Sequence, residues 1–240
     1  MVGLLGQRLF DPHGDTEILG WLPTAIALTA AADTDAETGL SLGRAGAIVA
    51  LRAVHAETGL GEAGAAARDL TERLAALESF AGRGFANGPT GVAYALGTSP
   101  DGRHTETARR ILAADQPRPD DLGWCSGRAG HLLARAALGL PGAEIATLVE
   151  RNPLRDSSLC HGEFGIQDTL IELDAPDLRR AASQALGAVE RYGPRCATPS
   201  GVTSPGLQTG LAGIGYGLLR LGFAERVPSV LLLAPGHRTQ

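Results

Sequence analysis

The chain has 240 residues, of which 44% are hydrophobic, 20% charged and only 4% aromatic, so a large β-sheet is disfavoured. Its net charge of −5, without a long run of either sign, excludes the basic surface of a nucleic-acid binder. Three cysteines are too few for a disulfide framework in a chain of this length, and their odd number fits a reducing compartment.

The first apolar stretch covers residues 17–32. It is too short to span a membrane, contains Gly20 and Pro23, and follows acidic residues rather than the lysines or arginines of a secretory signal. We therefore expect no membrane span and a cytoplasmic protein, in which residues 1–37 form a divergent N-terminal segment.

A Gly-x-x-Gly motif followed by an apolar helical run occurs five times along the rest of the chain. The motifs begin at intervals of 45, 39, 35 and 48 residues, at Gly43, Gly88, Gly127, Gly162 and Gly210. A unit of this length holds two helices and their connections, the scale of a helical-hairpin repeat. Apolar residues with helical spacing, such as Ile166, Leu170 and Leu173, predict a buried helix after each motif.

More polar helical stretches separate these buried helices. They are expected over residues 64–80, 104–115 and 143–151, and from near Pro176 to Tyr192. An alternation of buried and exposed helices builds an inner ring wrapped by an outer ring. The predicted fold is therefore all-α, an incomplete α/α toroid, with residues 1–240 in a single domain and five hairpin repeats over residues 38–235. The motif glycines are expected to let neighbouring inner helices approach closely.

If the five motifs are equivalent, the residue pairs just before their first glycines meet at one mouth of the ring. These pairs are Ser41-Leu42, Ala86-Asn87, Cys125-Ser126, Cys160-His161 and Gln208-Thr209. Two sulfurs and the imidazole of His161 suit a tetrahedral zinc site whose fourth position is open, as in a catalytic zinc site. The alternative is that each cysteine is a small buried hydrophobe and that His161 is a turn residue. Their equivalent repeat positions favour the metal site, whereas Cys196 has no such placement and is expected to be inert.

Three segments carry a resemblance to a known family: Gly-Trp-Cys-Ser-Gly-Arg-Ala-Gly at 123–130, Leu-Cys-His-Gly at 159–162, and residues 204–216. They resemble the lanthionine synthetase C-like cyclase family, and residues 226–233 look like the end of class II lanthipeptide synthetases. The resemblance implies a toroid of which this chain supplies about five of seven hairpins, and a Zn²⁺ ion held by Cys125, Cys160 and His161. It also implies thioether formation, in which substrate cysteine thiolates add to dehydroalanine or dehydrobutyrine in a dehydrated precursor peptide.

The chain departs from this family at the residues that would move a proton. Asn87 stands where the family has a histidine, and an asparagine cannot exchange a proton near neutral pH. The family also has an aspartate shortly before the first motif, whereas residues 38–42 contain no carboxylate, and Asp33, Asp35 and Glu37 lie slightly upstream. No catalytic residue is therefore assigned, and His131 is the best spare proton donor.

Thr209 and Gln208 line the same predicted mouth and are candidates for substrate binding, although a hydroxyl at this position more often caps a helix. Arg128 and Glu163, which follow motif glycines, are expected to be solvated.

Three functions are compatible with these residues. The first is a zinc-dependent lanthionine cyclase-like protein. The second is a catalytically impaired zinc- and peptide-binding module, or a fragment, without the general acid and base. The third is a toroid used for glycan or other chemistry, with incidental cysteines. Expected partners are the dehydrated precursor peptide, a dehydratase, and a chain that completes the toroid and covers its apolar open edges.

Overall fold

The computed structural model describes residues 20–31, 37–142 and 145–233, and all regular elements in these ranges are helical. The all-α prediction is thereby confirmed. One helix follows each Gly-x-x-Gly motif: α4 (Arg44–Thr58), α7 (Pro89–Gly97), α9 (Arg128–Ala137), α11 (Glu163–Glu172) and α13 (Leu211–Phe223). The other helices are α3 (Leu22–Ala31), α5 (Gly61–Ala75), α6 (Gly84–Asn87), α8 (Thr105–Ala114), α10 (Ile145–Val149) and α12 (Leu178–Tyr192), with a 3₁₀ turn, η1, over Pro199–Gly201.

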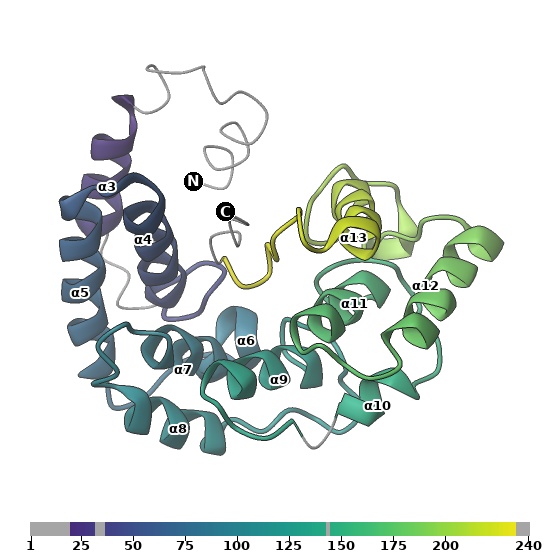
Figure 1. Cartoon of the computed structure of the whole chain (residues 1–240), viewed down its shortest axis with the longest axis horizontal. Coiled ribbons are helices and arrows are strands. Elements are labelled where there is room, and N and C mark those ends of the chain that lie inside the picture. Colours follow the sequence, from purple (N-terminus) through teal and green to yellow (C-terminus); the bar gives the residue numbers. More distant parts are fainter. Residues whose placement is uncertain (1–19, 32–36, 143–144, 234–240) are drawn as a thin grey trace.

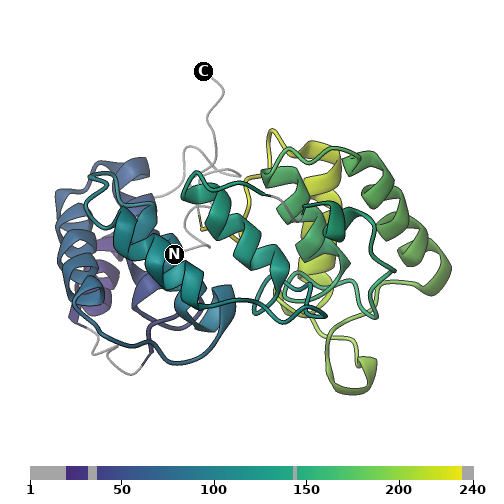
Figure 2. The same cartoon turned by 90° about the horizontal axis from the view of Figure 1, so that it is seen from below.

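The described helices form an arc with two layers. Helices α4, α7 and α11 lie on its inner side, and α5, α8 and α12 lie outside them (Figure 1). Figure 2 shows the same arc from below, with its two ends on opposite sides of the molecule. The arc agrees with an incomplete toroid, while the number of hairpins in a complete ring and the assignment to one domain stay predictions.

Burial distinguishes the two layers. Inner helix α11 is covered on nearly all sides, and Phe164, Ile166 and Leu170 are fully buried. Outer helix α12 buries only a narrow stripe of alanines, as expected for an amphipathic surface helix. The predicted alternation of buried and exposed helices is therefore observed for α11 and α12, whereas α13, which follows the fifth motif, exposes Leu219 and Phe223.

The second glycine of each motif packs most closely against the loop that precedes its own helix. At the second glycine of every motif, an added Cβ would lie 1.8–2.1 Å from the carbonyl oxygen six residues earlier, which belongs to Leu40, Phe85, Trp124, Leu159 or Leu207. The closest neighbour of each glycine is thus the loop that leads into its own helix. The expected close approach between neighbouring repeats is also seen, since an added Cβ at Gly130 would lie 2.5 Å from the Cβ of Phe85 in the preceding repeat, but the loop backbone is the nearer neighbour.

The same loops cap the inner helices with backbone carbonyls. The N-cap glycines are extended, and their helices have no side-chain cap. Instead, the first helical N–H donates to a carbonyl seven residues earlier: Arg128 to Asp121 (2.9 Å), Glu163 to Asp156 (3.1 Å) and Leu211 to Ser204 (2.8 Å). Each loop and the helix after it therefore fold as one unit.

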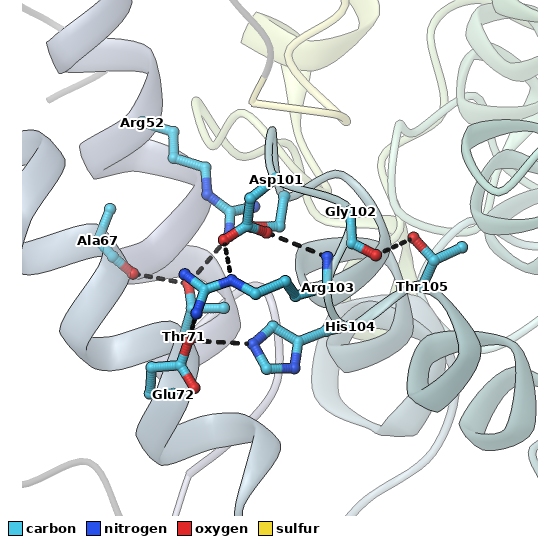
Figure 3. A network of polar contacts seen from close by, with 10 residues as sticks. Arg52, Ala67, Thr71, Glu72, Asp101, Gly102, Arg103, His104 and Thr105 are labelled. Carbon is cyan, nitrogen blue, oxygen red and sulfur yellow. Dashed lines mark hydrogen bonds and ion pairs between the residues drawn. The ribbon is translucent and has the colours of Figure 1, made fainter.

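Polar contacts join the first two hairpins on the outer side. The guanidinium of Arg52 donates to the Ala95 carbonyl (2.6 Å) and to Thr71 Oγ1 (2.9 Å), while Glu72 on α5 pairs with Arg103 (3.6 Å) and faces His104 (3.3 Å; Figure 3). The contacts of Arg52 tie α4 to α5 and α7, and those of Glu72 join α5 to the loop that precedes α8.

The segment after α13 folds back along the inner side of the arc (Figure 1). The Ser229 hydroxyl donates to Asp168 on α11 (2.8 Å), and the Tyr94 hydroxyl on α7 donates to the Leu232 carbonyl (3.1 Å). The side chain of Leu231 is buried between these contacts. None of the described helices has the length and apolar character needed to cross a bilayer.

Candidate metal centre

The five loops before the inner helices are joined side by side by one series of backbone hydrogen bonds. The N–H of Ser41 donates to the carbonyl of Ala86 (2.8 Å), Ala86 to Cys125 (2.9 Å), Cys125 to Cys160 (3.1 Å) and Cys160 to Gln208 (2.9 Å). Each of these residues lies two positions before the first glycine of its motif. The loops are therefore structurally equivalent and run side by side along one rim of the arc, as the repeat predicted.

Three side chains of types that can bind a metal meet at this rim. One ligand atom from each of Cys125, Cys160 and His161 lies within 4.8 Å of the other two. In a tetrahedral zinc site with bonds of about 2.0–2.3 Å, ligand atoms lie about 3.5–3.8 Å apart. Small side-chain movements would therefore bring the three atoms to ligand distances, so the residues present fit a zinc ion.

The cluster is open to solvent on one side. Both cysteines are half-buried, whereas 44% of the His161 side chain is exposed. A closed structural zinc site would have its fourth ligand from the protein, but no fourth histidine, cysteine or carboxylate joins this cluster among the described residues. The arrangement leaves room for an external ligand.

Glycines and small residues let the adjacent loops touch at the cluster. A Cβ added at Gly123 would lie 2.9 Å from the Cβ of His161 in the next loop. Gly84, with a φ of 71°, contacts the backbone of Ser126 in the same way. A larger side chain at Gly123 would push the loop of Cys160 and His161 away from that of Cys125, and one at Gly84 would displace the Cys125 loop from its other side.

Hydrogen bonds within the cluster stabilise a thiolate. The bond from the Cys160 thiol lowers the pKa of Cys125 to about 4, and the imidazole of His161 contributes in the same direction. The pKa of Cys160 is raised, because its thiol donates to that thiolate and because it is partly buried. The pKa of His161 is raised mainly by its hydrogen bond to Cys125. Cys125 is therefore the sulfur of this cluster that ionises most readily, and a thiolate is the form of cysteine that binds metals.

The other predicted site residues lie in the loops next to this cluster and differ in their exposure to solvent. Asn87 is exposed, in the loop whose Ala86 bonds to the backbone of Cys125. Thr209 and Gln208 are half-buried in the loop next to Cys160, and the Gln208 side-chain oxygen is buried without a hydrogen-bond partner. Their role in substrate binding stays a prediction.

Of the residues that the sequence suggested as substitute acids or as inert, none that the structure describes joins the cluster. Asp33 and Asp35 are outside the described residues, and Glu37 is exposed. His131 is buried within α9 at 6% exposure, and Cys196 is buried at 6%. Neither joins the cluster of Cys125, Cys160 and His161.

Sequence reasoning missed two features near the site. Glu163 was expected to be solvated but is fully buried, where it pairs with Arg151 and accepts a hydrogen bond from the Leu154 N–H. The second feature is a pair of aspartates, Asp121 and Asp156, in the loops that carry the cysteines. A cleft of about 350 Å³ lies beside them, lined by Arg118, Asp120, Asp121, Leu122, Gly123, Leu154 and His161.

A comparison with known protein families matches residues 42–232 to the family described as Lanthionine synthetase C-like protein. The chain belongs to this family. No curated protein matches the sequence. Lanthionine synthetase C-like proteins act on peptide substrates and commonly bind zinc, so the family agrees with a cyclase-like function and with a metal site at the cluster. The likeness to class II synthetases stays a prediction.

Proposed function

We propose that this lanthionine synthetase C-like protein is a zinc-dependent cyclase that forms thioether rings in a dehydrated ribosomal peptide. The observation that carries the proposal is the meeting of Cys125, Cys160 and His161 within 4.8 Å at a partly exposed mouth. These three side chains come from two separate hairpins of a family that acts on peptides.

Cys125, Cys160 and His161 would hold the zinc ion. When bound, zinc supplies the Lewis acidity that lowers the pKa of an incoming cysteine thiol from its usual value of about 8.5. The thiolate sulfur then adds to the β-carbon of dehydroalanine or dehydrobutyrine, and the α-carbon takes up a proton. The exposed side of His161 leaves a path for the peptide to reach the cluster.

The second candidate is a zinc- and peptide-binding module without turnover. Asn87 favours it, since this exposed residue beside the Cys125 loop cannot deliver a proton to the α-carbon. The two candidates differ in the protonation step alone, so they predict the same metal content but different products.

The proposed chemistry also defines partners. The peptide must arrive dehydrated, which requires a dehydratase, and both cysteines must stay reduced, as in the cytoplasm.

We further propose that another chain completes the toroid at α13. The exposed side of this helix is wholly apolar and consists of Leu211, Ala212, Gly215, Leu218, Leu219, Gly222 and Phe223.

Metal content and cyclisation test the proposal together. Elemental analysis of the purified protein should find one zinc per chain, and Cys125→Ala should lose it; metal retained in this variant would mean that the cysteines are incidental. The protein is then incubated with a peptide that contains a dehydroalanine and a cysteine. Because cyclisation leaves the mass unchanged, thiol alkylation followed by mass spectrometry reports it. Zinc without product supports the binding module, and the absence of both refutes the proposal.

A further inference from the structure

Two loops of the cluster contain an aspartate at the same position with the same backbone hydrogen bond. Asp121 and Asp156 each lie six residues before the first glycine of their motif. One carboxylate oxygen, Oδ1, accepts the N–H two residues later, from Gly123 (3.1 Å) or Ser158 (2.9 Å). The other oxygen, Oδ2, faces the side chain directly before the motif glycine.

The partner of Oδ2 differs between the two loops. In the first loop, Asp121 Oδ2 accepts a hydrogen bond from the Ser126 hydroxyl (2.7 Å). In the second, Asp156 Oδ2 lies 4.0 Å from Nε2 of His161. This distance is too long for a direct hydrogen bond and corresponds to an ion pair or a contact through one water. The equivalent aspartate oxygen therefore accepts a hydrogen bond from a hydroxyl in one loop and faces a candidate metal ligand in the next.

We propose that Asp156 is the positioning residue that orients His161 for zinc, by facing Nε2–H and leaving Nδ1 as the ligand atom. This inference rests on the proposed zinc binding. A neutral imidazole has one donor and one acceptor nitrogen, and histidines that bind metals usually donate the second N–H to a carboxylate or carbonyl. Asp156 itself is not a ligand, because no carboxylate of the described residues shares the 4.8 Å cluster with the two sulfurs and His161.

The carboxylate of Asp156 is held in place independently of His161. Its side chain is only 16% exposed, and its main-chain carbonyl accepts the N–H of Glu163 at the start of α11 (3.1 Å). Gly162 packs so tightly against it that an added Cβ would lie 2.2 Å from Oδ1. The imidazole, by contrast, is 44% exposed and needs a fixed neighbour to hold one ring orientation.

The test uses Asp156→Asn in the full chain, with Asp121→Asn as its matched control. Both amides keep an Oδ1 acceptor for the turn N–H, and both variants lose one negative charge near the cluster. Zinc affinity, measured by competition with a chromogenic chelator, should fall about 10- to 100-fold in Asp156→Asn and less than about threefold in Asp121→Asn. The metal-free proteins should melt within a degree or so of the wild type, because the turns are retained.

A second measurement reports the ring orientation itself. In ¹⁵N NMR spectra of the zinc-loaded wild type, His161 should show a metal-bound Nδ1 and a protonated Nε2. In Asp156→Asn the signal of the Nε2–H should broaden or disappear through faster exchange with water.

The outcomes separate this inference from the function on which it rests. Zinc affinity unchanged in Asp156→Asn, an equal loss in Asp121→Asn, or coordination through Nε2 would overturn the positioning role and leave the zinc site intact. A wild-type chain that binds no zinc would overturn both.

Discussion

Replacing Gly165 with alanine should unfold the protein at a lower temperature and displace Cys160. Gly165 is the second glycine of the fourth motif, within α11. An alanine Cβ would lie 2.0 Å from the carbonyl oxygen of Leu159, where ordinary C···O contacts begin near 3.3 Å. The backbone of Leu159 must therefore move by more than about 1 Å. Because Leu159 is fully buried and directly precedes Cys160, the movement reaches both the core and the metal cluster.

The magnitude follows from two opposing effects. Overpacking of this kind costs about 1–3 kcal/mol, and the upper end applies because the obstacle is backbone rather than a flexible side chain. An alanine in a helix gains back about 1 kcal/mol over glycine. The net loss is about 2 kcal/mol, which lowers the melting temperature of a chain of this size by roughly 4–8 °C.

Gly187→Ala is the matched control. Gly187 lies in α12 with no atom near an added Cβ, so only the helical gain of about 0.5–1 kcal/mol applies. Thermal unfolding followed by circular dichroism should therefore move in opposite directions for the two variants, and zinc content should fall only in Gly165→Ala. A melting temperature of Gly165→Ala equal to or above that of the wild type would refute the loop-packing argument.

Four further outcomes are expected. Glu163→Ala leaves Arg151 buried without its partner and should cost about 3–5 kcal/mol in urea unfolding, and a loss below 1 kcal/mol would contradict burial of the pair. Phe164→Ala should cost a similar amount through the cavity it creates, whereas Leu219→Ala, at an exposed position, should stay within about 0.5 kcal/mol in the same assay. Asn87→His should leave stability unchanged, since the side chain is exposed, and should raise the rate of thiol loss in the cyclisation assay; no gain would exclude proton delivery from this position. Free zinc at 100 times its dissociation constant should stabilise the chain by about 2.7 kcal/mol, seen as a higher melting temperature than in chelator.

Repetition is what made the architecture predictable from sequence. A single Gly-x-x-Gly motif has little meaning in a chain with 33 glycines, but five in series mark five equivalent positions. Equivalent positions in adjacent repeats must be neighbours in space, so Cys125 and His161 could be placed together despite the residues between them. The hydrogen bond from the Cys125 N–H to the Cys160 carbonyl shows directly that these equivalent positions are neighbours.

The atoms that each residue contacts could not be predicted as well from the sequence. The pattern showed that glycine is needed at each motif but not that the obstacle is a carbonyl six residues earlier. Similarly, Glu163 and Arg151 are separate charges in the sequence, and a charge is usually solvated. Their burial depends on the way the loop before Cys160 folds back over α11, which no local pattern records.

The aspartates do form a sequence pattern, a polar residue six positions before the first motif glycine, but its meaning is clear only once the loop structure is known. Asp121, Asp156 and Ser204 occupy the same position, and each accepts the N–H two residues later. These three loops therefore share one turn, whose N–H contact does not involve the side chain before the motif glycine, although Ser126 adds a hydrogen bond to Asp121 in one of them. That residue is free to vary, as serine, histidine or threonine in these loops and as Asn87 in the second loop. A change of side chain at this position in these three loops would leave the N–H contact of the turn and the start of the helix after it intact, because both are held by the residue six positions before the motif glycine.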